Sequence, residues 1–156
     1  MDFRITEARK EHVHLILSFI RQLAIYEKLE NDVVASEENI SFHLFEKKSA
    51  NCILAFEDDK AVGFALYFYN YSTFLGKQGL YLEDLFVTPE YRGKGYGKKL
   101  LLHIAKTALE NNCGRMEWSV LDWNTPAIDF YRSLGAVPMD EWTVYRLTEE
   151  RLKALF

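Results

Sequence analysis

Apolar residues recur along the chain with two periods, and together these periods predict a mixed α/β fold. Helices are predicted where the spacing is helical, over residues 11–27, from 37 onward, over 95–110 and over 125–134. Ser36 and Asn124 are suitable N-caps for the second and fourth of these helices. Gly135 follows the fourth helix at the position where a C-terminal glycine commonly stands.

Strands are predicted over the β-prone runs 3–8, 51–56, 61–69, 80–87, 116–121 and 142–147, with a short helical tail after the last. The polar residues 57–60 form a turn between two of these strands, and Pro89 ends the run 80–87. The order β-α-α-β-β-β-α-β-α-β predicts one mixed central sheet with helices on its faces. The β-α-β unit around residues 92–97 is expected to be parallel and right-handed. No repeat or linker interrupts the chain, so we expect a single domain over 1–156.

Composition narrows the class of protein. The 156 residues are 49% hydrophobic and 27% charged, which suits one packed domain. A net charge of −4 gives no basic face for nucleic acid, and no apolar run is long enough for a membrane span. Cys52 and Cys113 form no disulfide or metal pattern, the four histidines form no cluster, and the N-terminus does not resemble a signal peptide. We therefore expect a cytoplasmic protein with no metal site.

The most informative segment is the run 91–99, Tyr-Arg-Gly-Lys-Gly-Tyr-Gly-Lys-Lys, between a predicted strand and a predicted helix. Glycine permits close approach of a ligand to the backbone, and the first turn of a helix offers free N–H groups and a favourable dipole to an anion. Basic side chains in the run add charge complementarity. The segment lacks the spacing of a P-loop or a dinucleotide fingerprint. It predicts a diphosphate site, and the alternative is a flexible strand–helix connection.

This segment and a second one further along the chain resemble the motifs of a known family. Arg92-x-x-Gly95-x-Gly97 is similar to the [QR]-x-x-G-x-[GA] motif of the GNAT N-acetyltransferases, and Asn124-x-x-Ala127-x-x-Phe130-Tyr131 matches further on. Tyr26-Glu27, the run 81–87 and Trp123-Asn124-x-Pro126 resemble the diamine (spermidine/spermine) branch. The resemblance implies a GNAT-like fold, acetyl-CoA as co-substrate, and transfer of acetyl to a primary amine of a diamine or polyamine by direct attack in a ternary complex.

The resemblance also implies roles for individual residues. It assigns cofactor contacts to Leu85, Phe86, Val87, Arg92, Gly93, Lys94, Gly95, Tyr96, Gly97, Lys98, Asn124, Pro126, Ala127 and Tyr131. A phenol is protonated at neutral pH and can donate a proton to a departing thiolate, so Tyr131 is the candidate general acid. The alternative for Tyr131 is that it packs the helix on the sheet, as we expect for Phe130.

Acidic residues are the candidates for the acceptor side. Glu83 and Asp84 are adjacent on a predicted strand, so they face opposite sides unless a bulge intervenes. A carboxylate in an apolar strand is costly to bury unless it is paired, which makes one of them a site candidate. The resemblance selects Glu83 as the substrate contact and catalytic base, directly or through water, leaves Asp84 between a substrate contact and a structural role, and places Tyr26 and Glu27 at the distal amine.

The acceptor and the class of protein each have an alternative interpretation. The glutamate-rich stretch of the diamine branch is replaced here by Asp140-Glu141 and Trp142, which leaves a lysine-like acceptor (thialysine) or another small amine as an alternative. A non-catalytic CoA-binding regulatory module is the alternative of a different class. The resemblance and the aromatic residues near the C-terminus also predict a homodimer.

Overall fold

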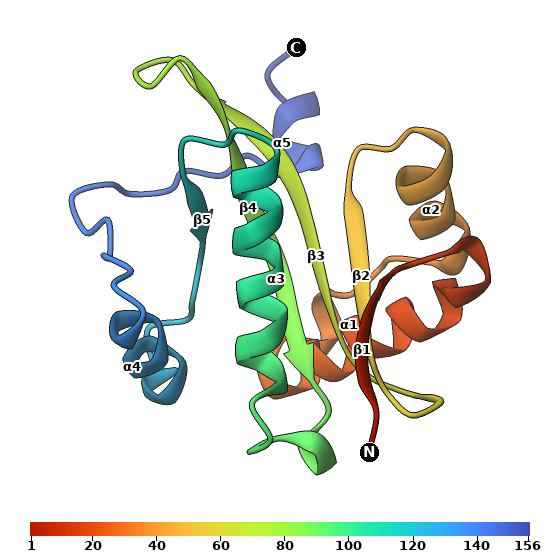
Figure 1. The fold of residues 1–156 in the computed structure, drawn as a ribbon. Helices are drawn as coiled ribbons and strands as arrows, with labels where there is room; N and C mark the ends of the chain where they lie inside the picture. Colours follow the sequence, from red (N-terminus) through yellow and green to blue (C-terminus); the bar gives the residue numbers. More distant parts are fainter. The chain divides into compact units, whose positions relative to one another are not determined.

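The computed structural model describes all residues of the chain, 1–156, and they divide into two compact units. The first unit comprises Met1–Ser119 and holds the whole sheet, and the second comprises Val120–Phe156. Figure 1 shows the elements of both units.

The first unit is built on a five-stranded mixed sheet with the order β1-β2-β3-β4-β5. Its strands are β1 (Phe3–Glu7), β2 (Asn51–Glu57), β3 (Lys60–Ser72), β4 (Lys77–Val87) and β5 (Met116–Trp118). Neighbours pair antiparallel from β1 to β4, and β5 pairs parallel to β4. Both the hairpin expected at residues 57–60 and the parallel β-α-β unit are therefore confirmed.

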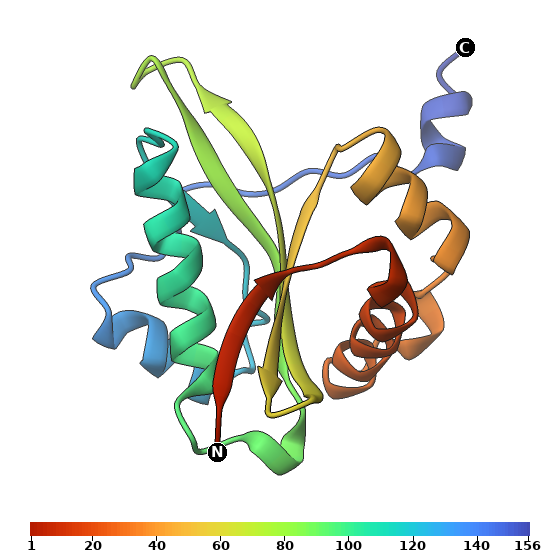
Figure 2. The ribbon, with the colours of Figure 1, turned by 45° about the vertical axis from the view of Figure 1, so that its right-hand side comes forward.

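Helices cover both faces of this sheet, as predicted. Figure 2 shows α3 (Tyr96–Glu110) on one side of the sheet, and α1 (Val13–Tyr26) and α2 (Glu37–Ser41) on the other. The 3-10 turns η1 (Lys10–His12), η2 (Glu30–Asp32) and η4 (Pro89–Tyr91) join these elements, and α2 runs on into the π-helical turn η3 (Phe42–Glu46). Ser36 caps α2 as expected, because its hydroxyl accepts from the N–H of Asn39 at 3.2 Å. None of the helices is long and apolar enough to cross a membrane.

The core lies on both faces of β3, the central strand. On the α1 side, Phe64 is fully buried and stacks on Phe19 with 5.5 Å between ring centroids. On the other side α3 buries Leu100 and Ile104. Gly63 lets the strands and α3 approach closely, because a Cβ there would lie 2.6 Å from the backbone oxygen of Phe86.

The second unit contains α4 (Thr125–Ser133) and α5 (Glu149–Lys153). Gly135 follows α4 with φ 89, which confirms the predicted glycine stop. The strand predicted over 142–147 is wrong, because these residues form no strand. Their β-prone sequence is insufficient alone, since a strand needs a hydrogen-bonded neighbour and this unit holds no other strand. The strand expected over 116–121 also ends early, at Trp118.

Candidate active site

The glycine loop joins the end of β4 to the start of α3 through η4. Gly93 and Gly95 both have φ 81, the left-handed conformation that side chains disfavour. An added Cβ at either position would meet no atom within 4 Å, so conformation rather than crowding requires glycine there. Gly97 differs, because it lies inside the first turn of α3, where a Cβ would make ordinary contacts with Val87 and Leu85.

The N-terminus of α3 offers unpaired backbone donors at this loop. Gly95 is the N-cap, and the N–H of Lys99 donates to its carbonyl oxygen at 3.0 Å. The N–H groups of Tyr96, Gly97 and Lys98 precede that bond and have no acceptor within the helix. Together with the helix dipole, these donors fit a phosphate group.

Arg92 turns back onto the protein. Its Nε donates to the carbonyl oxygen of Val87 at 3.0 Å, and its guanidinium lies over the rings of Tyr26 and Phe86, at 5.0 and 5.2 Å from their centroids. The side chain thus ties the loop to the end of β4 and to the C-terminal end of α1. Its predicted contact with the cofactor stays a prediction.

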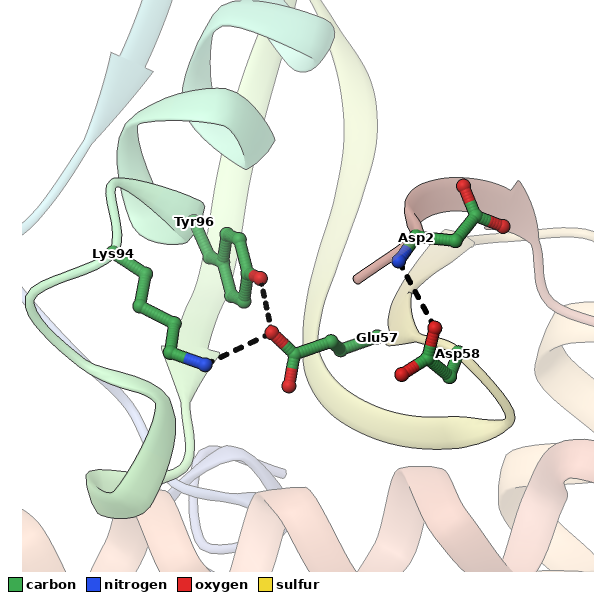
Figure 3. A network of polar contacts seen from close by, with 5 residues as sticks. All are labelled: Asp2, Glu57, Asp58, Lys94 and Tyr96. Atoms are coloured by element: carbon green, nitrogen blue, oxygen red, sulfur yellow. Dashed lines mark hydrogen bonds and ion pairs between the residues drawn. The ribbon is translucent and has the colours of Figure 1, made fainter.

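Lys94 and Tyr96 both bind one buried carboxylate, that of Glu57 at the end of β2 (Figure 3). The Lys94 Nζ lies 2.9 Å from Glu57 Oε1, and the Tyr96 hydroxyl donates to the same oxygen at 2.5 Å. These two hydrogen bonds lower the pKa of Glu57, and the carboxylate in turn raises the pKa of Tyr96 to about 12. Glu57 was not predicted as a site residue, because it falls in the predicted turn 57–60 and its partners lie almost forty residues further along the chain.

Lys98 and Lys99 are the remaining basic residues of the run 91–99, and they differ in their surroundings. The Lys99 Nζ lies over the ring of Phe3, 4.9 Å from its centroid. Lys98 is exposed, and no hydrogen bond or ion pair engages it. Of the loop's cations, Lys98 is therefore the one available to a ligand without loss of a protein contact.

The end of β4 has an open edge on the side of β5. The two strands pair only from Leu80↔Met116 to Leu82↔Trp118. Beyond that point the segment 83–87 has β3 on one side and no strand on the other. An extended ligand could add to this edge as a further strand does, which agrees with the expected cofactor contacts at Leu85, Phe86 and Val87.

A β-bulge in β4 changes the relation between the two adjacent carboxylates. Leu66 pairs with Asp84 and Tyr67 pairs with Leu82, so Glu83 is an extra residue without a partner on β3. Glu83 and Asp84 were predicted to face opposite sides unless a bulge intervened, and the structure contains that bulge.

Asp84 is half-buried on the side of the sheet that α1 covers, since Leu66 and Phe86 belong to that core. Burial raises the pKa of Asp84 to about 7, and the charges of Glu83 and Glu27 add to the effect. Glu27 is the C-cap of α1, and burial also raises its pKa. The structure therefore brings three of the predicted acceptor residues, Glu27, Glu83 and Asp84, within electrostatic reach of one another.

The remaining candidates belong to the second unit. Asn124 is the N-cap of α4, although its side chain makes no capping hydrogen bond, and Pro126 stands in the first turn. Ala127 and Tyr131 follow on the same helix. Their roles as cofactor contacts, and that of Tyr131 as general acid, stay predictions.

Comparison with known proteins now gives the family. Residues 17–136 match the acetyltransferase (GNAT) family model, which covers most of the chain. Thialysine N-epsilon-acetyltransferase of Bos taurus is 38% identical, over 97% of this chain and 95% of that protein. L-Ornithine N5-acetyltransferase of Arabidopsis thaliana is 32% identical, over 97% of this chain and 87% of that protein. A human spermidine/spermine N(1)-acetyltransferase-like protein is 30% identical over 96% of this chain but 23% of its own length.

Solved structures agree with the fold. An integron cassette protein from the mobile metagenome of V. cholerae superposes with a TM-score of 0.81 and 33% identity, over 99% of this chain and 98% of that one. The chain belongs to the GNAT acetyltransferase family, and it is an N-acetyltransferase that acts on amines. The predicted family and fold class are thereby confirmed.

Proposed function

We propose that this enzyme transfers acetyl from acetyl-CoA to the terminal primary amine of a small molecule, by direct attack in a ternary complex. The observation that carries the proposal is the arrangement of β4. Its open edge over 83–87 leads into the glycine loop, and the half-buried Asp84 lies on the same segment beside Glu83 and Glu27.

Acetyl-CoA fits the first half of this arrangement. The pantetheine arm would bind the backbone of 83–87, and the pyrophosphate would lie at the free N–H groups of the α3 N-terminus, near Lys98. A backbone N–H of the segment 85–87 would stabilise the oxyanion that develops on the thioester carbonyl. Such a donor is typically worth about 3–4 kcal/mol in the transition state.

The acceptor amine must lose a proton before it attacks. A carboxylate whose pKa lies near 7 is half ionised at neutral pH, so it binds an ammonium group and can also accept its proton. We assign this work to Asp84 together with Glu83, which contacts the amine from the bulge. The nitrogen then forms a bond to the acetyl carbon while the C–S bond breaks. The departing thiolate takes a proton, for which we keep Tyr131 as the donor, and the second proton of the attacking nitrogen then returns Tyr131 to its neutral phenol.

The relatives and the charges at the site support a proposal for the acceptor class. Two relatives that match over most of their own length are named for thialysine and ornithine, which are amino acids with a terminal amine. We propose an amino acid of this type as the first acceptor. A diamine or polyamine is the second candidate, and the carboxylate of Glu27 at the end of α1 supports it, because a second ammonium group would be attracted there.

Two further proposals concern the protein as a whole. We propose a homodimer, supported by the family resemblance and by Trp142, Tyr145 and Phe156, which are all exposed. We propose a cytoplasmic location, supported by Cys52 and Cys113, which are both free thiols.

A thiol-release assay tests the proposed reaction. The enzyme is supplied with acetyl-CoA and, in separate reactions, thialysine, ornithine, spermidine, a short diamine and a monoamine. We expect thiol release with the amino acids at lower Michaelis constants than with the monoamine. Thiol release that no amine accelerates would refute the reaction, and release with spermidine but neither amino acid would refute the first acceptor class alone.

A further inference from the structure

Glu57 is the one charged residue of strand β2. It ends β2, its side chain is only 7% exposed, and it is one of two buried polar or charged residues in the molecule. A buried carboxylate is costly unless it is well paired, and Glu57 is paired twice, with the Lys94 ammonium and the Tyr96 hydroxyl. Figure 3 shows both partners reaching it from the glycine loop.

The hairpin that carries Glu57 is itself anchored at this end of the sheet. The carboxylate of Asp58, the next residue, accepts a hydrogen bond from the backbone N–H of Asp2 at 2.9 Å (Figure 3). The backbone N–H of Asp58 also donates to the Asp2 carbonyl at 2.7 Å. Tyr96 is fixed from a second side, because its ring stacks on Phe3 with 4.2 Å between centroids. The carboxylate is therefore a fixed point, and the loop is the part that it can hold.

We propose that Glu57 is a positioning residue of the glycine loop. By holding Lys94 and Tyr96, it keeps Gly93 and Gly95 in the left-handed conformation in which the neighbouring N–H groups face the phosphates. Lys94 is then a structural cation and not a phosphate ligand. The ammonium is already engaged by Glu57 and lies over the Tyr91 ring at 5.1 Å. Phosphate recognition would rest on the backbone and on Lys98. This inference rests on the proposed use of acetyl-CoA.

The two alternative roles of Lys94 predict opposite changes in acetyl-CoA affinity for the substitution Glu57→Gln. If Lys94 were a phosphate ligand restrained by Glu57, then Glu57→Gln would release it, and acetyl-CoA would bind more tightly. If Glu57 positions the loop, the same substitution weakens a charge-assisted hydrogen bond that orders the loop, and acetyl-CoA binds less tightly. We expect the Michaelis constant for acetyl-CoA to rise about tenfold, which is typical of a lost hydrogen bond to a charged group. The turnover number should stay within about twofold of the wild type, because a positioning residue of the loop acts on binding rather than on the chemical step.

Matched variants distinguish an effect on the loop from a general loss of stability. Asp59→Asn removes an exposed carboxylate two residues away on the same hairpin and should leave the Michaelis constant unchanged. Tyr96→Phe removes only the second hydrogen bond and keeps the ring on Phe3, so it should raise the Michaelis constant in the same direction as Glu57→Gln. Lys94→Met combined with Glu57→Gln should give less than the product of the single effects, because both break one contact.

Salt dependence identifies the cation that meets the phosphates. Lys98→Met should flatten the rise of the acetyl-CoA Michaelis constant with salt, whereas Lys94→Met should leave that slope as in the wild type. A flattened slope in Lys94→Met, or tighter binding in Glu57→Gln, would overturn the inference.

A readout that needs no acetyl-CoA keeps this inference separate from the proposed function. Trypsin cleaves after Arg92 and Lys94, and we expect the ligand-free Glu57→Gln protein to be cut in this loop several times faster than Asp59→Asn at the same temperature. Equal cleavage rates would overturn the positioning role. If calorimetric titration of the wild type with CoA showed no binding, the proposed function would fail, and the cleavage rates would still decide whether Glu57 holds the loop.

Discussion

Replacement of Asp84 by asparagine should stabilise the protein, and by an amount that depends on pH. An asparagine side chain would keep the shape and polarity of the protonated carboxyl group but could not ionise. In the wild type, burial and the charges of Glu83 and Glu27 raise the pKa of Asp84 from 3.8 to about 7. The folded state therefore holds a proton on Asp84 at pH values where the unfolded chain has lost it.

The sign of the effect follows from this difference in proton binding. Between about pH 4 and pH 7 the folded state binds more protons than the unfolded state, so the free energy of unfolding falls as the pH rises. Each pH unit in the window corresponds to about 1.4 kcal/mol, which gives a ceiling of about 4 kcal/mol above pH 7. Because Asp84 keeps part of its contact with solvent, we expect Asp84→Asn to gain about 2–4 kcal/mol over the wild type at pH 8. At pH 4 the two proteins should be about equally stable.

Urea unfolding at pH 4, 5, 6, 7 and 8 measures this difference for the two proteins under one buffer ionic strength. Glu83→Gln is the matched control, since Glu83 is the exposed neighbour and its removal should change the profile much less. A second measurement adds a diamine at pH 8. It should stabilise the wild type, whose ionised carboxylate binds an ammonium group, more than Asp84→Asn.

Two results would refute the reasoning. A difference in unfolding free energy that does not vary with pH would mean that Asp84 titrates as an ordinary surface carboxylate. Loss of stability at pH 8 would mean that a favourable partner within the protein holds the ionised carboxylate, contrary to the raised pKa that burial and the neighbouring carboxylates produce.

Four other predictions test the remaining assignments. Gly95→Ala and Gly76→Ala both place a side chain at positive φ and should each cost about 1–2 kcal/mol of stability, but only Gly95→Ala should weaken CoA binding in calorimetry. Tyr131→Phe should bind acetyl-CoA normally and lose roughly 10²–10⁴ in turnover, and turnover near that of the wild type would argue against a general acid. Glu27→Gln should raise the Michaelis constant for spermidine more than that for a monoamine, and equal changes would remove Glu27 from the acceptor site. Sedimentation at micromolar concentration should give twice the 18.3 kDa of one chain, and a single-chain mass would contradict the homodimer.

The fold and the glycine loop were predictable because their signals are local. Periodicity located the helices, and glycines alternating between a strand and a helix located the loop that the structure builds around Gly93 and Gly95. The predicted strand over 142–147 failed because strand formation is not local. Its residues favour an extended backbone, but pairing depends on a neighbour that the sequence pattern does not specify.

The arrangement of the carboxylates at the site also depends on strand pairing, which the local sequence does not specify. Glu83 and Asp84 were identified from their cost inside an apolar strand, yet their relation depends on how β4 is aligned with β3. Glu57 was missed for a similar reason. As the last residue of an apolar run it has the appearance of a turn residue, and only the folded chain brings it to Lys94 and Tyr96.

The bulge at Glu83 links the two halves of the proposed site. Pairing of β4 with β5 stops at Leu82, and the extra residue on β4 is the next one, Glu83. A bulge bends its strand and increases the local twist, so it is a sufficient reason for β4 to diverge from β5 at this point. The divergence leaves the backbone of 83–87 free on one edge, where we propose that the thioester binds. Asp84 follows the bulge directly and lies two residues before Phe86, so both face the α1 side, where the charges of Glu83 and Glu27 act on Asp84. The bulge thus accounts for the open edge that suits the acyl donor, and the residue directly after it is the acidic group that suits the amine.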